Sequence, residues 1–378
     1  MPAGEADDPM STHQRIADAP TPGTDPGGAR CLDQTRFLHE ARFWEPLAED
    51  KLRCQLCPRA CVILPGKIGH CGVRQNREGT LQTLVYSRVC SAHIDPIEKK
   101  PLFHFLPGST ALSIATAGCN VDCRFCQNAE IAHPAAGPIP GEFAPPDAIV
   151  QLALAHHCPA IAFTYTEPTI FAEFLMDTAE AARAAGIRTV AISNGFIQPE
   201  PLRQAFGLLD AVKIDLKAFN PKFYRDVVGA RLEPVLDTLV ALRAMGKWLE
   251  IVNLLIPTLN DSDDELRAMA SWIHANLGPD VPLHFSRFHP DHQMLHLPPT
   301  PTATLERARQ IALAEGLRYV YIGNIPGHPA QNTHCPHCRQ LLVERVGFTA
   351  TRNLLTTSNT CPGCGQTIAG FWQNRKTG

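Results

Sequence analysis

The chain has 378 residues, of which 44% are hydrophobic and 19% are charged, and its formal net charge is -3. This composition is typical of a soluble globular protein with one large domain and some appendages. A broad nucleic-acid surface needs a basic excess, which the chain lacks. No apolar run approaches the length of a membrane span, and the N-terminus has no signal-peptide pattern, so we expect a cytoplasmic protein without membrane segments.

The chain begins with a low-complexity segment and then contains groups of closely spaced cysteines. Residues 1–30 are rich in Pro, Gly, Ala and Asp without hydrophobic periodicity, which predicts a disordered tail. Eleven of the fourteen cysteines in the chain then fall into three tight groups. Without a secretion signal, such grouping indicates metal binding in a reducing compartment rather than disulfides.

The first group belongs to a predicted N-terminal cysteine-rich module, residues 31–108, which opens with a short helix expected at Thr35–Glu45. Its members are Cys54, Cys57, Cys61 and Cys71. Glycine-rich turns between them suit tight thiolate loops. Zinc is the first expectation for this group, while an iron–sulfur cluster or buried thiols without metal remain open alternatives.

A charged loop ends this module. Lys99, Lys100 and His104 either face an acidic ligand or belong to a solvated loop before the next strand. The run of charges favours the solvated loop.

Strands and helices alternate through residues 109–325. The predicted strands are Ala111–Thr116, Ala160–Thr164, Thr189–Ser193, Ala211–Leu216, Trp248–Leu255, Val281–Phe285 and Arg318–Ile322. The predicted helices are Phe171–Ala185, Asp237–Ala244, Ser262–Asn276 and Thr304–Glu315. This alternation predicts an α/β fold with a parallel sheet, specifically a partial (β/α) barrel of the TIM type. In such folds, ligands bind at the C-terminal ends of the strands.

The second group, Cys119, Cys123 and Cys126, follows the first of these strands. Three thiolates in eight residues suit a soft metal or an iron–sulfur cluster, and a closed structural site would need a fourth ligand. The next cysteine is Cys158, so the spacing indicates a cluster with one open iron.

A C-x3-C-x-Phe-C spacing after a first strand resembles the radical S-adenosylmethionine (SAM) enzymes. Phe125 stands just before the last cysteine, where that family packs the adenine of SAM. The resemblance implies a [4Fe–4S] cluster on Cys119, Cys123 and Cys126, with SAM chelating the open iron. The alternative is a zinc knuckle that has lost a ligand.

Polar residues follow most of the later strands. They are Thr164, Tyr165, Glu167, Asn194, Asp215, Lys217, Asn253 and His284. As a set at one edge of an apolar sheet they predict a ligand site. Individually, Asn194 and Asn253 also fit turn or capping positions, and Lys213 or Lys217 beside Asp215 also fits a structural ion pair.

The segments Tyr165-Thr166-Glu167-Pro168, Ser193-Asn194-Gly195 and Asp215-Leu216-Lys217 are similar to motifs of the pyruvate formate-lyase activating enzymes. From about Arg53 to Trp372 the chain more closely resembles the radical SAM enzyme of the AmmeMemoRadiSam system. That resemblance implies that residues 164–168 hold the methionine amino group. It places Asn194, Asp215, Lys217 and Asn253 around the carboxylate and ribose.

The same resemblance implies a low-potential electron donor such as flavodoxin or ferredoxin, and leaves Memo-like protein partners open. One departure concerns the residues before Glu167. Formate-lyase activators usually have glycines there, whereas this chain has Tyr165 and Thr166. The role of Glu167 therefore stays open.

The last predicted segment, residues 326–378, carries two C-x2-C pairs: Cys335, Cys338, Cys361 and Cys364. Two such pairs around a strand-rich stretch are a zinc-ribbon signature, with a rubredoxin-like iron site as the alternative.

The resemblance implies an enzyme that cleaves SAM reductively to a 5'-deoxyadenosyl radical, which abstracts hydrogen from an unidentified substrate. The alternatives are an activating enzyme for a glycyl-radical enzyme, and a zinc-bearing scaffold without radical chemistry.

Overall fold

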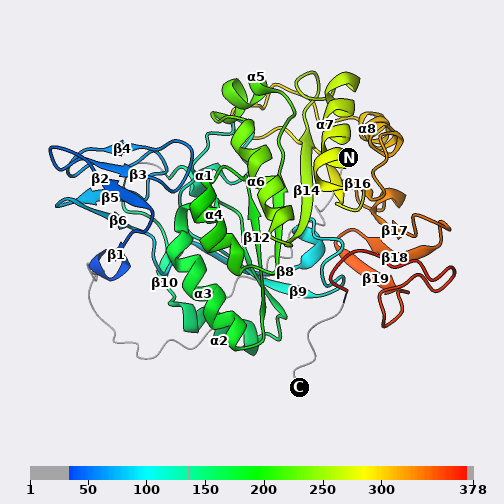
Figure 1. The fold of residues 1–378 in the computed structure, drawn as a ribbon, viewed down its shortest axis with the longest axis horizontal. Coiled ribbons are helices and arrows are strands. Elements are labelled where there is room, and N and C mark those ends of the chain that lie inside the picture. Colours follow the sequence, from blue (N-terminus) through cyan, green and yellow to red (C-terminus); the bar gives the residue numbers. More distant parts are fainter. Residues whose placement is uncertain (1–33, 135–136, 373–378) are drawn as a thin grey trace, which may run out of the picture.

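The computed structural model describes residues 34–134 and 137–372. The predicted tail at residues 1–30 lies outside the described residues. A large sheet with its covering helices occupies the centre of the molecule, and two smaller cysteine-bearing modules lie at opposite ends of it (Figure 1).

The central sheet has eight strands in the order β16-β15-β14-β13-β12-β11-β9-β8. Their bounds are β8 (Ser91–Pro96), β9 (Thr110–Ala115), β11 (Ala160–Phe163), β12 (Arg188–Ser193), β13 (Ala211–Asp215), β14 (Trp248–Leu255), β15 (Leu283–Arg287) and β16 (Val320–Gly323). Strand β9 and strands β11 to β16 pair in parallel, and β8 pairs antiparallel with β9. The predicted α/β fold is confirmed, while closure into a partial barrel stays a prediction.

Helices connect the parallel strands in succession. They are α2 (Pro146–Ala155), α3 (Ala172–Ala184), α4 (Pro199–Ala205), α6 (Glu233–Ala244), α7 (Asp263–Leu277) and α8 (Thr302–Ala314). The shorter α1 (Ala129–Ala132) follows the cysteine loop, and α5 (Pro221–Phe223) leads into a π-helical turn at Tyr224–Val228. Pro stands in the first turn of α2, α4 and α6, where its missing N–H costs no hydrogen bond.

The two faces of the sheet differ because side chains alternate along each strand. Ile161, Val212 and Ile214 belong to the large core that includes the helices. Small residues such as Ala162 and Ala211 occupy the opposite face. We call this second face the inner face, and it leaves space at the carboxyl ends of the strands for a cavity.

At the amino ends of the strands, the inner face is closed by a buried polar network. The Glu250 carboxylate accepts hydrogen bonds from the backbone N–H groups of Phe103 and His104, at 3.0 and 2.8 Å. His284 Nε2 lies 2.7 Å from the same carboxylate. His284 and His104 are therefore part of a buried structural network. His284 does not line the cavity at the carboxyl ends, and the solvated loop favoured from the sequence was wrong for His104, which is fully buried.

The C-terminal module, which we define as residues 329–372, completes this closure. It contains β17 (Thr333–His334), β18 (Leu341–Val346) and β19 (Thr349–Asn353) in one antiparallel sheet. Arg345 of β18 is fully buried, donates to the Phe103 carbonyl at 2.7 Å and lies 3.6 Å from the Glu98 carboxylate. One buried arginine thus connects this module to the loop before β9.

The N-terminal module, defined here as residues 34–83, consists of two small antiparallel sheets. One contains β1 (His39–Glu40), β6 (Thr80–Thr83) and β5 (Arg74–Arg77), and the other contains β2 (Trp44–Pro46), β3 (Leu52–Cys54) and β4 (Val62–Ile63). The helix expected at Thr35–Glu45 was wrong, because only Gln34–Phe37 is helical, as a 3-10 turn, while His39–Glu40 and Trp44–Pro46 pair as strands.

Strand β7 (Arg88–Val89) pairs antiparallel with β10 (Glu142–Phe143) beside α2. Within the described residues, no helix combines the length and the apolar character needed to cross a membrane.

Candidate active site

The loop that carries Cys119, Cys123 and Cys126 leaves the carboxyl end of β9. Hydrogen bonds to the segment after α5 hold the backbone of this loop. The N–H groups of Asp122 and Arg124 donate to the carbonyls of Val228 and Val227 at 2.8 and 3.0 Å. Val227 and Val228 end the π-helical turn at Tyr224–Val228, and the last carbonyls of a helix have no partner within it, so they are free to accept these bonds. This holds the cysteine loop against the core.

Arg59 of the N-terminal module fixes the same loop from outside. Its guanidinium donates to the Asn120 carbonyl at 2.5 Å, to the Asp122 carboxylate at 3.0 Å and to the Gly229 carbonyl at 2.6 Å. The Asp122 carboxylate also lies 3.0 Å from His70 Nε2. Nothing in the local spacing of the sequence signalled this clamp, because Arg59 lies more than fifty residues before its partners.

A cavity of about 480 Å³ opens beside the loop, at the carboxyl ends of the strands. Among the described residues, three cysteines line it: Cys119, Cys123 and Cys126. The strands contribute inner-face residues, including Ile192, Lys213, Asp215, Val252, Leu254 and Ser286. The cavity thus lies where ligands bind in open parallel sheets.

Thiols in this cavity are protonated unless a metal binds. Burial raises the pKa of the Cys123 thiol to about 11, although the nearby charge of Lys217 opposes the rise. Metal binding must therefore release a proton. Three thiols from one loop, facing an open cavity, fit a [4Fe–4S] cluster that keeps one iron for an outside ligand.

Glu167 lies at the turn after β11 and is almost fully buried. Its carboxylate accepts hydrogen bonds from Ser193 Oγ at 2.7 Å, from the Asn194 N–H at 2.8 Å and from the Thr169 N–H at 2.9 Å. Burial raises the pKa of this carboxyl, while these donors oppose the rise. Both oxygens are engaged within the protein, so Glu167 connects the ends of β11 and β12.

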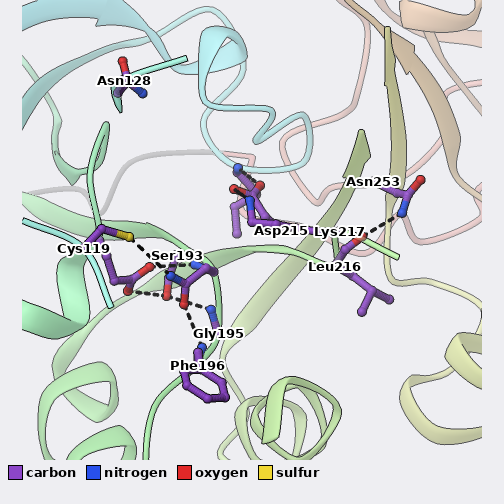
Figure 2. A network of polar contacts seen from close by, with 12 residues as sticks. Cys119, Asn128, Ser193, Gly195, Phe196, Asp215, Leu216, Lys217 and Asn253 are labelled. Atoms are coloured by element: carbon purple, nitrogen blue, oxygen red, sulfur yellow. Dashed lines mark hydrogen bonds and ion pairs between the residues drawn. The ribbon is translucent and has the colours of Figure 1, made fainter. Parts of the chain in front are cut away.

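Asn194 is used in a similar way. Its amide nitrogen donates to Asn120 Oδ1 at 2.8 Å, and its amide oxygen accepts from the Phe196 N–H at 2.8 Å. Asn194 also lines the cavity, and its Nδ2 lies 3.9 Å from Cys119 Sγ (Figure 2). Asn194 therefore hydrogen-bonds within the turn after β12 and also lines the cavity, so both alternatives that the sequence left open describe it.

A second group of polar side chains projects from β13 (Figure 2). Asp215 pairs with Lys213, and it pairs with Lys217 at 3.4 Å. Burial alone would raise the pKa of Asp215, but the two lysines hold it below its usual value. Since two cations share one carboxylate, this group carries one net positive charge into the cavity.

A matching group reaches the cavity from the loop after β8. Lys99 and Lys100 both pair with Asp95, at 2.9 and 2.5 Å, and the Tyr165 hydroxyl donates to the same carboxylate. Lys100 is 3% exposed. The solvated loop favoured from the sequence was therefore wrong for Lys100, because its ammonium packs over the Tyr165 ring at 4.3 Å and lines the cavity.

Tyr165 lies in the turn after β11, and its backbone takes the conformation that glycine favours. Its φ is 64°, in the left-handed region, which costs a non-glycine residue about 1–2 kcal/mol. The Asn128 amide donates to the Tyr165 carbonyl at 2.8 Å, and Thr166 Oγ1 donates to the Thr116 carbonyl at 2.7 Å. These two hydrogen bonds hold the turn after β11 in this conformation.

Of the other residues that the sequence placed in the site, two line the cavity and one does not. Thr164 and Phe125 line the cavity, and the Phe125 ring lies 5.6 Å from the Lys217 ammonium. Asn253 is not among the lining residues: it is 1% exposed, and its amide donates to the Leu216 carbonyl at 2.7 Å (Figure 2). It supports the Asp215–Lys217 segment from behind.

The C-terminal cysteines converge on one point. Cys335, Cys338, Cys361 and Cys364 place their sulfur atoms within 4.8 Å of one another, and two of the Sγ–Sγ distances are 3.6 Å. Four thiolates around one tetrahedral ion at a Zn–S distance of 2.3 Å would stand about 3.8 Å apart. The four-cysteine group expected near the C-terminus is therefore present, with a spacing suited to a single ion.

Comparisons with known proteins identify the family. Residues 113–273 match the model of the radical SAM superfamily. The uncharacterized protein MJ0808 of Methanocaldococcus jannaschii is 46% identical over 332 residues, which cover 88% of this chain and 99% of that protein. This chain belongs to the radical SAM superfamily. Membership indicates an enzyme, and the radical SAM fold implies a [4Fe–4S] cluster and SAM.

Weaker similarities extend to one further curated protein and to solved structures. The benzylsuccinate synthase activating enzyme of Thauera aromatica is 29% identical over 108 residues, covering 28% of this chain and 33% of that enzyme. A domain of a pyruvate-formate lyase-activating enzyme from Bacteroides vulgatus shares 18% identity over 43% of this chain and 98% of its own, with a TM-score of 0.39. Streptococcus suis SuiB bound to SAM shares 14% identity over 60% of this chain and 53% of its own, with a TM-score of 0.46.

Proposed function

We propose that this protein binds a [4Fe–4S] cluster through Cys119, Cys123 and Cys126 and uses it to cleave SAM. The observation that carries the proposal is the cavity itself, where three thiols from one loop meet two lysine–aspartate groups. When bound, the cluster supplies one electron for reductive cleavage of SAM to methionine and a 5'-deoxyadenosyl radical, which takes hydrogen from a substrate.

The chain contributes binding and orientation. The net positive charge of the Lys213–Asp215–Lys217 group suits the carboxylate of SAM. Phe125 offers an apolar ring for adenine, while Thr164, Tyr165 and Asn194 offer hydroxyl and amide groups to the amino group and ribose. Glu167 fixes the two strand ends that carry these residues, so its part is positioning.

A second candidate is narrower: activation of a glycyl-radical enzyme, with a protein as the substrate. The local similarity to the benzylsuccinate synthase activating enzyme favours it. The AmmeMemoRadiSam assignment, Memo-like partners and a flavodoxin or ferredoxin donor also remain proposals. We further propose zinc for the four C-terminal cysteines, because their sulfur spacing fits one tetrahedral ion.

The test is anaerobic iron and sulfide quantification on the wild type and on Cys126→Ala, followed by a 5'-deoxyadenosine assay under dithionite. Removal of one of three anchoring ligands should abolish the assay signal and remove about one cluster's worth of iron. Cys90→Ala, outside the three groups, is the matched control. If SAM leaves the reduced-cluster EPR spectrum of the wild type unchanged, the proposal fails.

A further inference from the structure

The cavity contains two lysine–aspartate groups, whereas SAM has one carboxylate. The group after β8 consists of Lys99, Lys100 and Asp95, and it has the same composition as the group on β13. In each group two ammonium ions share one carboxylate, so each group carries one net positive charge. The group on β13 suits the carboxylate of SAM, and the group after β8 is left without an anion of its own.

The group after β8 reaches the cavity from the end opposite to the cysteine loop. Strand β8 runs antiparallel to β9, and Pro96 at its end pairs with Thr110 at the start of β9. The loop after β8 therefore begins at the amino ends of the parallel strands, whereas the cysteine loop leaves their carboxyl ends. Lys99 and Lys100 line the end of the cavity that we call its floor. A ligand bound between this floor and the cysteine loop would contact both.

The two lysines of the floor have more hydrogen-bond donors than the protein uses. Lys99 Nζ and Lys100 Nζ each donate to the Asp95 carboxylate, at 2.9 and 2.5 Å, and the Tyr165 hydroxyl donates to it as well. An ammonium group has three N–H donors, so two on each lysine remain for another acceptor. Lys100 is buried, and buried donors without an acceptor are costly. This favours an acceptor supplied by a ligand.

The charges around the floor also favour an anion. Burial lowers the pKa of Lys100 to about 8, Asp95 opposes the shift, and the charges of Lys99 and Lys213 add to it. Lys213 belongs to the group on β13, so the two groups are close enough to repel each other. Among the described residues that line the cavity, four are lysines and two are carboxylic acids. A bound anion would reduce this repulsion.

We propose that Lys99 and Lys100 bind a carboxylate or phosphate group of the substrate, and that the substrate is a small anionic molecule. Bound there, it would extend from the floor toward the cysteine loop, where SAM would lie. This inference rests on the proposed function. It favours a small molecule over a glycyl-radical enzyme as the substrate, because a glycine segment would present neutral backbone to these lysines.

Titration calorimetry on the anaerobically reconstituted full chain tests the anion site. Inorganic phosphate and succinate are the probes, and saturating SAM without reductant keeps the β13 group occupied and prevents cleavage. At least one probe should bind, and the stronger of the two identifies the anionic group. Lys99→Met and Lys100→Met should each weaken binding about tenfold or more, because a charged hydrogen bond is lost, while Lys99→Arg should retain it.

Each variant leaves Asp95 one lysine partner, and thermal unfolding checks that it folds. Lys67→Met, which changes an exposed lysine of the N-terminal module, is the matched control and should bind the probes as the wild type does.

Three results would overturn the proposal. They are binding of neither probe, binding that survives both Lys99→Met and Lys100→Met, and displacement of both probes from the wild type by SAM, since the lysines would then serve SAM itself. If the probes bind through these lysines but the wild type does not cleave SAM under dithionite, the anion site stands and the proposed function fails. If SAM is cleaved but neither probe binds, the substrate inference alone fails.

Discussion

The N-terminal and C-terminal modules both carry four cysteines, yet they attach to opposite ends of the central sheet. Arg59 and Cys71 of the N-terminal module contact the loop at the carboxyl ends of the strands, beside the cavity. Arg345 of the C-terminal module instead reaches the loop at the amino ends, near Glu250 and Phe103. The two modules thus have the same number of cysteines but contact opposite ends of the central sheet.

The position of each module indicates how substitutions in it should act. At the amino ends, a single tetrahedral ion would fix a module that only closes the core. At the carboxyl ends, the N-terminal module lies beside the cavity, where changes in charge or in packing would alter ligand binding. Substitutions in the two regions should therefore separate stability from cofactor binding.

The largest effect on stability is expected from Arg345→Met. The change leaves the buried Glu98 carboxylate without its cation, which should cost about 3–5 kcal/mol in the free energy of unfolding. Urea unfolding measures this loss, and the affinity of the holoenzyme for SAM should not change. Arg318→Met, which removes a surface pair with Asp280, is the control and should cost less than about 1 kcal/mol.

If Arg345→Met instead lowers the affinity for SAM and leaves the free energy of unfolding unchanged, the C-terminal module does more than close the core.

An intermediate effect is expected from Gly118→Ala, at the junction of the N-terminal module with the active-site loop. Its φ of 107° and the close approach of the Cys71 carbonyl and the Val73 side chain leave no room for a Cβ. We expect a loss of roughly 2–4 kcal/mol together with weaker iron retention at the active site. Urea unfolding and iron analysis measure both.

Gly66→Ala is the matched control, since Gly66 also has a positive φ but has open space around it. It should cost about 1 kcal/mol and leave the iron content unchanged. Equal effects of the two substitutions would show that strain alone, and not the contact between the module and the loop, explains the result.

The smallest effect concerns pH at the cavity. Burial lowers the pKa of Lys100 to about 8, although the Asp95 charge opposes the shift. The ammonium is therefore cationic below pH 8 and is lost as the pH rises through that value, which removes positive charge from the cavity. Titration calorimetry should show SAM affinity falling up to about tenfold between pH 7 and pH 9.

Lys100→Met should bind SAM more weakly at pH 7 and show a flatter profile, so that the two proteins converge at high pH. Parallel profiles for the wild type and the variant would exclude Lys100 as the titrating group.

The sequence alone determined the fold class and predicted which cysteines belong together. Buried strands alternating with helices predicted the parallel sheet, since a strand with both faces covered must be apolar throughout. The spacing of Cys119, Cys123 and Cys126 predicted an open cluster site, because those ligands lie within one loop. Local patterns suffice wherever the interacting groups are near neighbours in the chain.

Only the tertiary structure decided which polar residues share the cavity. It brought Lys100 and Asp95 to Tyr165, set Asn253 behind the cavity and placed Arg59 on the active-site loop. It also brought the two separated C-terminal cysteine pairs together, so that their four sulfur atoms lie within 4.8 Å of one another. The reason is physical: contacts between distant segments depend on how helices and strands pack, and residue spacing along the chain does not record that packing.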